Sequence, residues 1–427
     1  MRRESIGKWS WFLAAVVISA LGLAGCGGGG GGGGGTSFFS GVTRVGGNNN
    51  SGDLGIAMSQ TGRFVAFSSL ASDLTGAGND NNSSYDIFVY DRQTADITVA
   101  SRINGTFSLK VSNADDSSFF PSISSSGRFV AFESRAENLV GAGVDTNLKS
   151  DIFVQDRDFN TTTRVSVAAL GLPTQPDGDS NKPSISGDGN FVAFQSLATN
   201  LVAGDTNGIA DVFLYNRAAG TTTRISGAAG GALFGHCVSD NGTRVAFESP
   251  PGGALRQIFV WTSPGPAVAI TAGNGDSRIS GISGNGRFVV FDSDATDLVA
   301  GDNNAVSDVF VYDMLTGTAE RVSVATGGAQ SNGASFALGH KAISDDGNRI
   351  IFESDATNLG GTGSPGYFVR NRAAGTTTFL AGIAATMQSA GADISGDGLV
   401  AAFGTDDPAI ASGDTGGFFD VFIIPVP

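Results

Sequence analysis

The chain has 427 residues, of which 64 are Gly and 30 are Phe, while only 15% are charged. With 41% hydrophobic residues it can bury a sizeable core, but so much glycine and so little charge argue against a long-helix or coiled-coil protein and favour an all-β repeat protein. The formal net charge of −15 disfavours a nucleic-acid partner, which requires a basic surface, and two cysteines cannot form a disulfide framework.

Residues 1–25 have the features of a lipoprotein signal peptide. Arg2, Arg3 and Lys8 form a basic region, and an apolar run over residues 11–23 follows it. The 13 residues of this run are fewer than the roughly 20 that span a bilayer, which disfavours the alternative of a short transmembrane anchor. Residues 23–26 then read Leu-Ala-Gly-Cys. This resembles the lipobox of bacterial lipoproteins and implies that Cys26 becomes the lipid-carrying first residue.

Residues 26–41 are expected to be the lipidated cysteine and a flexible tether. Nine glycines occupy positions 27–35, and glycine loses more backbone entropy on ordering than any other residue. Removal of residues 1–25 takes away three basic groups and one acid, so the mature chain has 22 Lys+Arg against 39 Asp+Glu and a formal charge of −17. Gly27 directly after the lipidated cysteine resembles the outer-membrane sorting pattern. We therefore expect a chain lipid-anchored in the bacterial cell envelope and, in a Gram-negative source, at the outer membrane, periplasmic or surface-exposed.

Residues 42–427 consist of one unit repeated seven times. Its most regular part is a polar turn that ends in glycine and leads into an apolar strand with two phenylalanines, as in residues 127–132. A short strand precedes the turn, and a third and a fourth strand follow, as in residues 151–154 and 163–166. Four short strands per repeat, with turn glycines 44 to 65 residues apart, predict an all-β, seven-bladed β-propeller of four-stranded blades.

The two ends of the repeat region complement each other. The last repeat stops after its third strand, at residues 420–423, whereas residues 42–45 stand alone before the first repeat and match the Thr-Arg-Val pattern of the fourth strands. We therefore expect the N-terminal strand to complete the last blade, which leaves no unpaired blade edge.

The repeated turn resembles the strand-turn-strand signature of the TolB-type, WD-repeat-like propellers of bacterial envelopes. That signature reads Ser-Pro-Asp-Gly before an Ile/Val-Ala-Phe strand; its Ser, Gly and Phe positions recur seven times here, and its proline is missing each time, as in residues 239–242. The resemblance covers residues 42–425 and implies a β-propeller fold and a location in the bacterial cell envelope. Residues 36–41 leave no room for the N-terminal α/β domain through which TolB contacts inner-membrane partners.

The two histidines and the second cysteine are the first candidates for chemistry. His236 and His340 each precede the first strand of a repeat. They could be a catalytic pair, since some pectin-degrading lyases use a TolB-like propeller with several histidines around a metal, or ordinary surface or core histidines. Cys237 neighbours His236, but adjacent residues of a strand point to opposite faces, which excludes a local Cys-His pair and favours a buried thiol.

An Asp-x-Asn-x-x-x-Asp pattern precedes the third strand of five repeats. Oxygen ligands at this spacing are typical of weak Ca²⁺ loops, with Kd of order 10⁻⁴ to 10⁻³ M. Alternatively, Asp and Asn side chains can brace a loop through Asx-turns without any ion. Gln257 and Gly366 replace the last Asp in the other two repeats. The five sets are Asp80, Asn82 and Asp86; Asp145, Asn147 and Asp151; Asp205, Asn207 and Asp211; Asp302, Asn304 and Asp308; and, with two acids only, Asp414 and Asp420.

No nucleophile elbow, phosphate loop or zinc spacing is present in the sequence. The sequence therefore predicts a non-enzymatic scaffold that binds an envelope protein or glycan, with a propeller-based polysaccharide lyase or hydrolase as the alternative. We expect no cofactor other than calcium, no nucleic-acid partner, membrane contact through the lipid anchor only, and a monomer.

Overall fold

The computed structural model is built from β-strands alone. It describes residues 42–45, 47, 55–76, 82–104, 114–141, 143–168, 175–227, 235–249, 255–337, 339, 341–361, 365–383, 389–407, 410 and 419–427. Among these residues no helix is long and apolar enough to cross a membrane. The predicted signal peptide, tether and Cys26 lie outside them.

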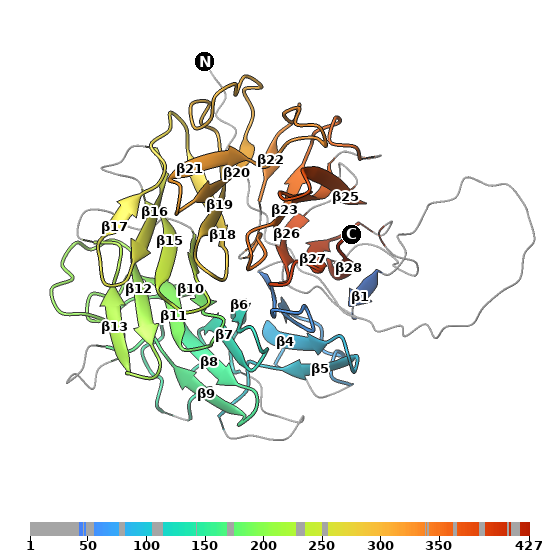
Figure 1. Cartoon of the computed structure of the whole chain (residues 1–427). Helices are drawn as coiled ribbons and strands as arrows, with labels where there is room; N and C mark the ends of the chain where they lie inside the picture. Colours follow the sequence, from blue (N-terminus) through green and yellow to red (C-terminus); the bar gives the residue numbers. More distant parts are fainter. Residues whose placement is uncertain are drawn as a thin grey trace, which may run out of the picture.

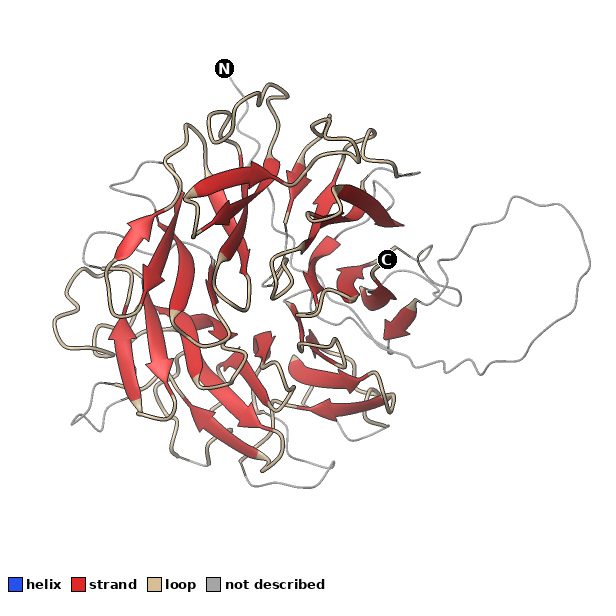
Figure 2. Cartoon of the chain, viewed as in Figure 1, coloured by secondary structure: helices blue, strands red, loops and turns tan. Residues whose placement is uncertain are grey.

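Seven four-stranded antiparallel sheets stand around a central axis, so the predicted seven-bladed propeller is confirmed (Figures 1 and 2). The first strand of each blade lies nearest the axis and the fourth lies at the rim. The blades, numbered here along the chain, are β2 (Ile56–Met58), β3 (Phe64–Ser69), β4 (Asp86–Asp91) and β5 (Asp96–Val99); β6 (Ser118–Ile123), β7 (Phe129–Ser134), β8 (Asp151–Asp156) and β9 (Thr161–Arg164); β10 (Ser180–Ile185), β11 (Phe191–Ser196), β12 (Asp211–Asn216) and β13 (Thr221–Arg224); β14 (His236–Val238), β15 (Arg244–Ser249), β16 (Gln257–Thr262) and β17 (Ala267–Ala269); β18 (Ser277–Ile282), β19 (Phe288–Ser293), β20 (Asp308–Asp313) and β21 (Thr318–Arg321); β22 (Ser335–Phe336), β23 (Arg349–Ser354), β24 (Gly366–Asn371) and β25 (Thr376–Gly382); and β26 (Ser389–Ile394), β27 (Val400–Thr405), β28 (Asp420–Pro425) and β1 (Thr43–Val45).

The N-terminal strand closes the ring, as the sequence predicts. β1 pairs antiparallel with β28, so that Thr43 faces Ile423 and Val45 faces Val421. The Arg44 guanidinium adds an ion pair, with its Nε 2.6 Å from Oδ2 of the buried Asp420. Blade 7 therefore joins the first and last strands of the chain.

A stacked phenylalanine pair forms the centre of every blade. The second and third strands place two rings side by side in register, and Phe132 and Phe153 show the arrangement, with their ring centroids 6.0 Å apart. Offset aromatic pairs of this kind contribute both buried area and a specific geometry. The other pairs are Phe67 and Phe88, Phe194 and Phe213, Phe247 and Phe259, Phe291 and Phe310, Phe352 and Phe368, and Phe403 and Phe422.

The repeated turn holds neighbouring blades together. Its serine is buried and accepts a hydrogen bond from the backbone five residues on, as Ser124 Oγ does from Phe129 N at 3.0 Å. Its glycine has positive φ, 77° at Gly127, and packs against the preceding blade so closely that a Cβ there would lie 2.1 Å from the Phe64 ring. Arg157, from the same blade as Gly127, also contacts this ring, with its guanidinium carbon Cζ 4.7 Å from the Phe64 centroid. The signature thus encodes contacts between blades as well as a turn.

The two faces of the ring differ in the kind of connection they carry. Because the strands of a blade alternate in direction, the turns between strands one and two and between strands three and four meet at one end of the blade. We call this end the turn face. The longer connections between strands two and three, and from blade to blade, form the loop face.

Candidate functional site

The Asp-x-Asn-x-x-x-Asp loops on the loop face form hydrogen-bonded networks. In blade 2, Asn147 Nδ2 donates to Asp151 Oδ2 at 2.9 Å, and Ser166 Oγ donates to Asp151 Oδ1 at 2.5 Å. The side-chain oxygen Oδ1 of Asn147 accepts a hydrogen bond from the Lys149 backbone N–H at 3.0 Å. This contact is the Asx-turn that the loop-bracing alternative requires. Burial raises the pKa of Asp151 to about 6, against the lowering effect of Ser166 and Arg164. Asn82 with Asp86, Asn207 with Asp211, and Asn304 with Asp308 repeat the amide-to-carboxylate contact at 3.0, 2.8 and 2.9 Å.

An arginine from the fourth strand supplies positive charge to these networks. Arg164 Nη1 lies 3.0 Å from Asp145 Oδ1 and 3.5 Å from Asp151 Oδ2. Arg224 lies 2.8 and 3.5 Å from Asp205 and Asp211, and Arg321 lies 3.4 and 3.6 Å from Asp302 and Asp308. In these three blades a guanidinium thus already lies against both carboxylates.

The arginine occupies one position of the blade, opposite the inner phenylalanine of the third strand. Arg164 pairs with Phe153, and Arg44 pairs with Phe422 in the same way and meets Asp420. Blades 4 and 6, which lack the acids, have Ala269 and Phe379 at this position. The sequence analysis missed this partner, although its co-occurrence with the acids was visible in the repeats.

Blade 1 is the exception, because Val99 stands opposite Phe88. Its Asp86 is buried and accepts hydrogen bonds from Asn82 and from Ser101 at 2.5 Å. Asp80 and Asp414 lie outside the described residues. The geometry of the described sets supports loop bracing, and within the described part of the chain no group of three or more His, Cys, Asp or Glu is arranged to hold a metal. Calcium binding stays a prediction.

The histidine and cysteine candidates do not form a reactive pair. His236 and Cys237 lie next to each other on the inner strand β14 and are both buried, and Cys237 is a free thiol. Burial, with Asp393 and Glu248 nearby, raises the pKa of the Cys237 thiol, so it is kept protonated. This is the buried thiol that the sequence predicts. His340 lies outside the described residues.

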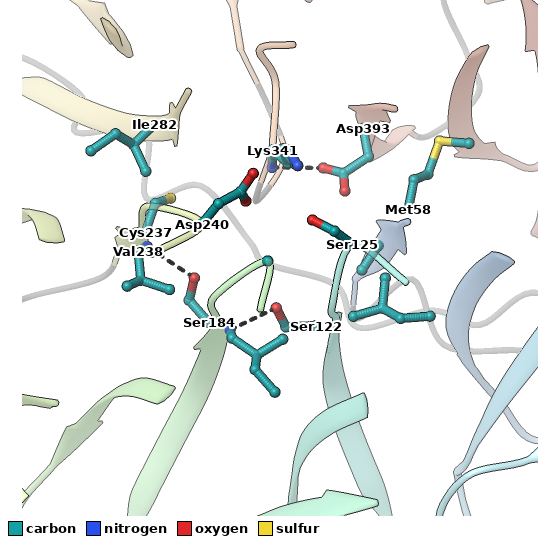
Figure 3. Close-up of a pocket in the computed structure, with 14 residues that line it drawn as sticks. Met58, Ser122, Ser125, Ser184, Cys237, Val238, Asp240, Ile282, Lys341 and Asp393 are labelled. Carbon is teal, nitrogen blue, oxygen red and sulfur yellow. Dashed lines mark hydrogen bonds between the residues drawn. The ribbon is translucent and has the colours of Figure 1, made fainter. Parts of the chain in front are cut away.

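Cys237 borders a cavity on the propeller axis (Figure 3). Inner strands supply one level of its lining, with Ser122, Ser184, Cys237 and Asp393 at equivalent positions of four blades. The turns that follow supply a second level nearer the turn face, at the positions of Ser125, Gly187 and Asp240. Backbone hydrogen bonds link this second level from blade to blade, for example Asp240 N to Gly284 O at 2.9 Å.

Carboxylates outnumber ammonium groups in this cavity. Lys341 Nζ lies 2.8 Å from Asp345 Oδ1, and the Lys341 backbone N–H donates to Asp393 Oδ1 at 2.8 Å. Burial lowers the pKa of Lys341, but Asp345 and Asp240 together raise it, so the ammonium stays charged. Burial and Asp345 raise the pKa of Asp240 against the effect of Lys341. The charged residues that line the cavity are Asp240, Asp393 and Lys341, so its lining has more acidic than basic groups.

Glycines make room for the two acids at the turn face. A Cβ on Gly284 would lie 2.3 Å from Asp240 Oδ2 and 2.7 Å from Asp345 Cγ, so both carboxylates reach into the space beside this glycine. Gly396 faces Asp345 in the same way, with 2.3 Å to Oδ2. The sequence analysis did not single out Asp240, Lys341, Asp345 or Asp393. The available signal was that Asp240 and Asp345 are acidic, whereas Ser125 and Gly187 occupy the equivalent turn position in blades 2 and 3.

Solved structures share this architecture. An oligogalacturonate lyase from Vibrio parahaemolyticus is 12% identical, with a TM-score of 0.53 over 88% of this chain and 89% of that chain. The β-propeller domain of the trilobed protease from Pyrococcus furiosus is 11% identical, with a TM-score of 0.51 over 86% and 91%. A putative TolB from Agrobacterium tumefaciens is 17% identical, with a TM-score of 0.38 over 63% and 79%. The shared fold is that of a seven-bladed β-propeller.

The similarity of this propeller to the lyase and the protease is one of fold, because sequence identities this low transfer no activity. No protein-family model matches the sequence, and no curated protein sequence does.

Proposed function

We propose that the protein is an envelope-anchored lipoprotein whose TolB-like propeller is a non-enzymatic scaffold for a protein or glycan ligand. The cavity on the axis supports this proposal, since two aspartates, Asp240 and Asp393, line it beside one lysine, Lys341, whose ammonium already pairs with Asp345. A ligand that carries a lysine, an arginine or an amino sugar gains a charge-assisted contact there. The ligand class is therefore a cationic segment of an envelope protein or glycan.

The chemistry of the other candidates also favours binding. A nucleophilic cysteine needs a lowered pKa, whereas burial raises that of Cys237. The lyase or hydrolase alternative rests on the shared fold with oligogalacturonate lyase, which does not carry a reaction to this chain. The scaffold needs only the surfaces and the cavity that the ring provides.

The cavity is tested by binding of a fluorescent oligolysine peptide, with an oligoglutamate peptide as the probe of opposite charge. We expect the Asp240→Asn, Asp345→Asn variant to lose most of the oligolysine affinity. The matched control is Asp96→Asn, Asp158→Asn, which removes two exposed acids elsewhere on the turn face. Equal losses in both variants would mean that general surface charge, rather than the cavity, binds the peptide. A pull-down from envelope extracts with and without chelator then searches for the ligand and for metal dependence together.

The anchor is tested at Cys26. Phase separation in detergent should move the mature chain into the detergent phase and leave Cys26→Ser in the aqueous phase. Partitioning of the serine variant with the unaltered protein would refute lipidation at this residue.

A further inference from the structure

The two halves of the propeller differ in charge. On the turn face, acidic and basic side chains nearly balance, and several are bidentate pairs, in which Arg63, Arg128 and Arg287 hold Asp91, Asp156 and Asp313 with contacts of 2.7 Å. On the loop face, acids far exceed bases among the described residues, with Asp115, Asp177, Asp276, Asp297 and Asp355 in the connections. The negative charge of this chain is therefore concentrated on the loop face.

The direction of the N-terminal strand β1 shows at which face of the ring it begins. Thr43 of β1 pairs with Ile423, whereas Val45 pairs with Val421, so the strand begins nearer the Pro425 end of β28. Pro425 pairs with Val400 at the start of β27, directly after a turn of the turn face. The chain that precedes Val42 therefore departs from the turn face.

The expected reach of the tether is similar to the height of the ring. From Cys26 to Gly41 the chain has 15 peptide links, which for a glycine-rich coil would give a root-mean-square reach of about 20 to 25 Å. A six-residue strand is itself roughly 20 Å long. A tether that joins the ring at the turn face would therefore use most of this reach to place the loop face against the membrane.

We propose that the turn face is the surface apposed to an anionic phospholipid bilayer, with the acidic loop face directed away from it. This orientation rests on the lipid anchor proposed above. Anionic lipids repel the loop face and tolerate the balanced turn face, so charge and tether act in the same direction. Exposed apolar side chains occur on both faces, such as Leu315 and Leu148, and do not select between them.

Energy transfer from single labels to lipids tests the orientation. Ala218→Cys labels the turn between β12 and β13, and Thr206→Cys labels the loop between β11 and β12 of the same blade, both at exposed positions. The lipidated chain is bound to vesicles of phosphatidylethanolamine and phosphatidylglycerol that contain an acceptor lipid. We expect higher transfer from position 218 than from position 206. Equal or reversed transfer in bound protein overturns the orientation alone, whereas failure of the lipidated chain to bind vesicles overturns the anchor as well.

Added charge gives the second arm of the test. Gln93→Glu, Leu315→Glu and Ala373→Glu make the turn face acidic, and Thr146→Glu, Leu197→Glu and Ala203→Glu are the matched set on the loop face, all at exposed positions. The turn-face set should reduce the difference in transfer between the two labels, and the loop-face set should preserve it. The opposite pattern would contradict a role of lipid charge in the orientation.

Discussion

At the scale of single residues, the turn glycines meet two separate demands. Gly127 has a φ of 77°, which any other residue adopts only with strain, and it leaves no room for a Cβ beside Phe64. Gly143 has nearly the same φ, 74°, but nothing lies within 4 Å of the Cβ position. A comparison of Gly127 with Gly143 therefore distinguishes the cost of backbone strain from the cost of disturbed packing between blades.

Gly127→Ala should therefore destabilise the protein more than Gly143→Ala does. Both variants carry the cost of a positive φ, about 1 kcal/mol, and only Gly127→Ala must also push the Phe64 ring away, for which overpacking costs of about 1 to 3 kcal/mol are typical. Urea unfolding of the two variants measures the difference. Equal free energies of unfolding would show that the signature glycine serves the turn alone.

The arginines of the fourth strands give a second prediction. Arg224→Met keeps much of the apolar side-chain volume and leaves the buried Asp205 and Asp211 without their guanidinium. We expect a loss of about 3 to 5 kcal/mol, as for other buried pairs from which one partner is removed. The control is Arg135→Met, an exposed arginine on the same face, which should change stability little. A small effect at both positions would show that water or another ion replaces the guanidinium.

Calcium binding is best tested at the loop whose carboxylates have no fourth-strand arginine beside them. Blade 1 has Val99 in place of the arginine, so its Asp80, Asn82 and Asp86 set is the one where a cation meets no guanidinium from that position. With a Kd near 10⁻³ M, 10 mM calcium would stabilise one site by about 1.4 kcal/mol. Melting temperatures in calcium and in magnesium at equal ionic strength give the comparison. We expect an excess calcium response that Asp86→Asn abolishes and Asp211→Asn leaves. No excess over magnesium would identify all five sets as loop braces.

At the scale of secondary-structure elements, the strands can be predicted from the sequence because the same local pattern recurs in all seven repeats. Alternation of apolar residues, the turn glycine and the stray segment at residues 42–45 are local signals, and the strands, the ring and its closure are as predicted. The arginine of the loop networks and the cavity acids are not local. Arg164 meets Asp145 only through the register of β8 with β9. Asp240 of blade 4 and Asp345 of blade 6 both approach Gly284 only because their blades lie on either side of blade 5 in the ring. Such contacts depend on how the strands and blades pack, which no single repeat contains.

Deletion of residues 36–46 should expose the edge of β28. Without β1, the Phe422 and Asp420 side of blade 7 loses both its strand partner and the Arg44 ion pair. An open edge pairs with other chains, so we expect aggregation or a marked fall in melting temperature. Size-exclusion chromatography and thermal unfolding measure these effects. A monomer with unchanged melting temperature would refute closure by this strand.

At the scale of the whole molecule, buried carboxylates between the blades make stability depend on pH. Burial raises the pKa of Glu133 and of Glu248 to about 7, although each accepts a backbone hydrogen bond from the next blade, Glu133 from Lys182 at 2.7 Å and Glu248 from Ile279 at 2.9 Å. Burial also raises the pKa of Asp292 to about 7, despite Arg278. In contrast, the Arg287 contact lowers the pKa of Asp313 to about 2.

We expect the folded protein to be most stable near pH 4. Between about pH 4 and pH 7 the folded state binds more protons at Glu133, Glu248 and Asp292 than the unfolded state does, so stability falls as the pH rises through this range. Below pH 4 the sign reverses at Asp313, whose stabilising contribution disappears as the carboxylate is protonated. Urea unfolding from pH 3 to pH 8 gives the profile. Glu133→Gln should flatten its upper part, and Glu137→Gln, at a partly exposed position on the same loop face, should not.

The swapped strand in blade 7 has a consequence for the order in which the protein is made. β1 precedes the other strands of all seven blades in the sequence, whereas β28, its partner, follows the first six blades. The N-terminal strand must therefore wait, unpaired, until the six blades between them have been synthesised. Blades 1 to 6 contain all four of their strands in sequence and can assemble as they emerge, since domains form as their residues become available. Completion of the ring is thus a late event, because it requires both β1 and β28.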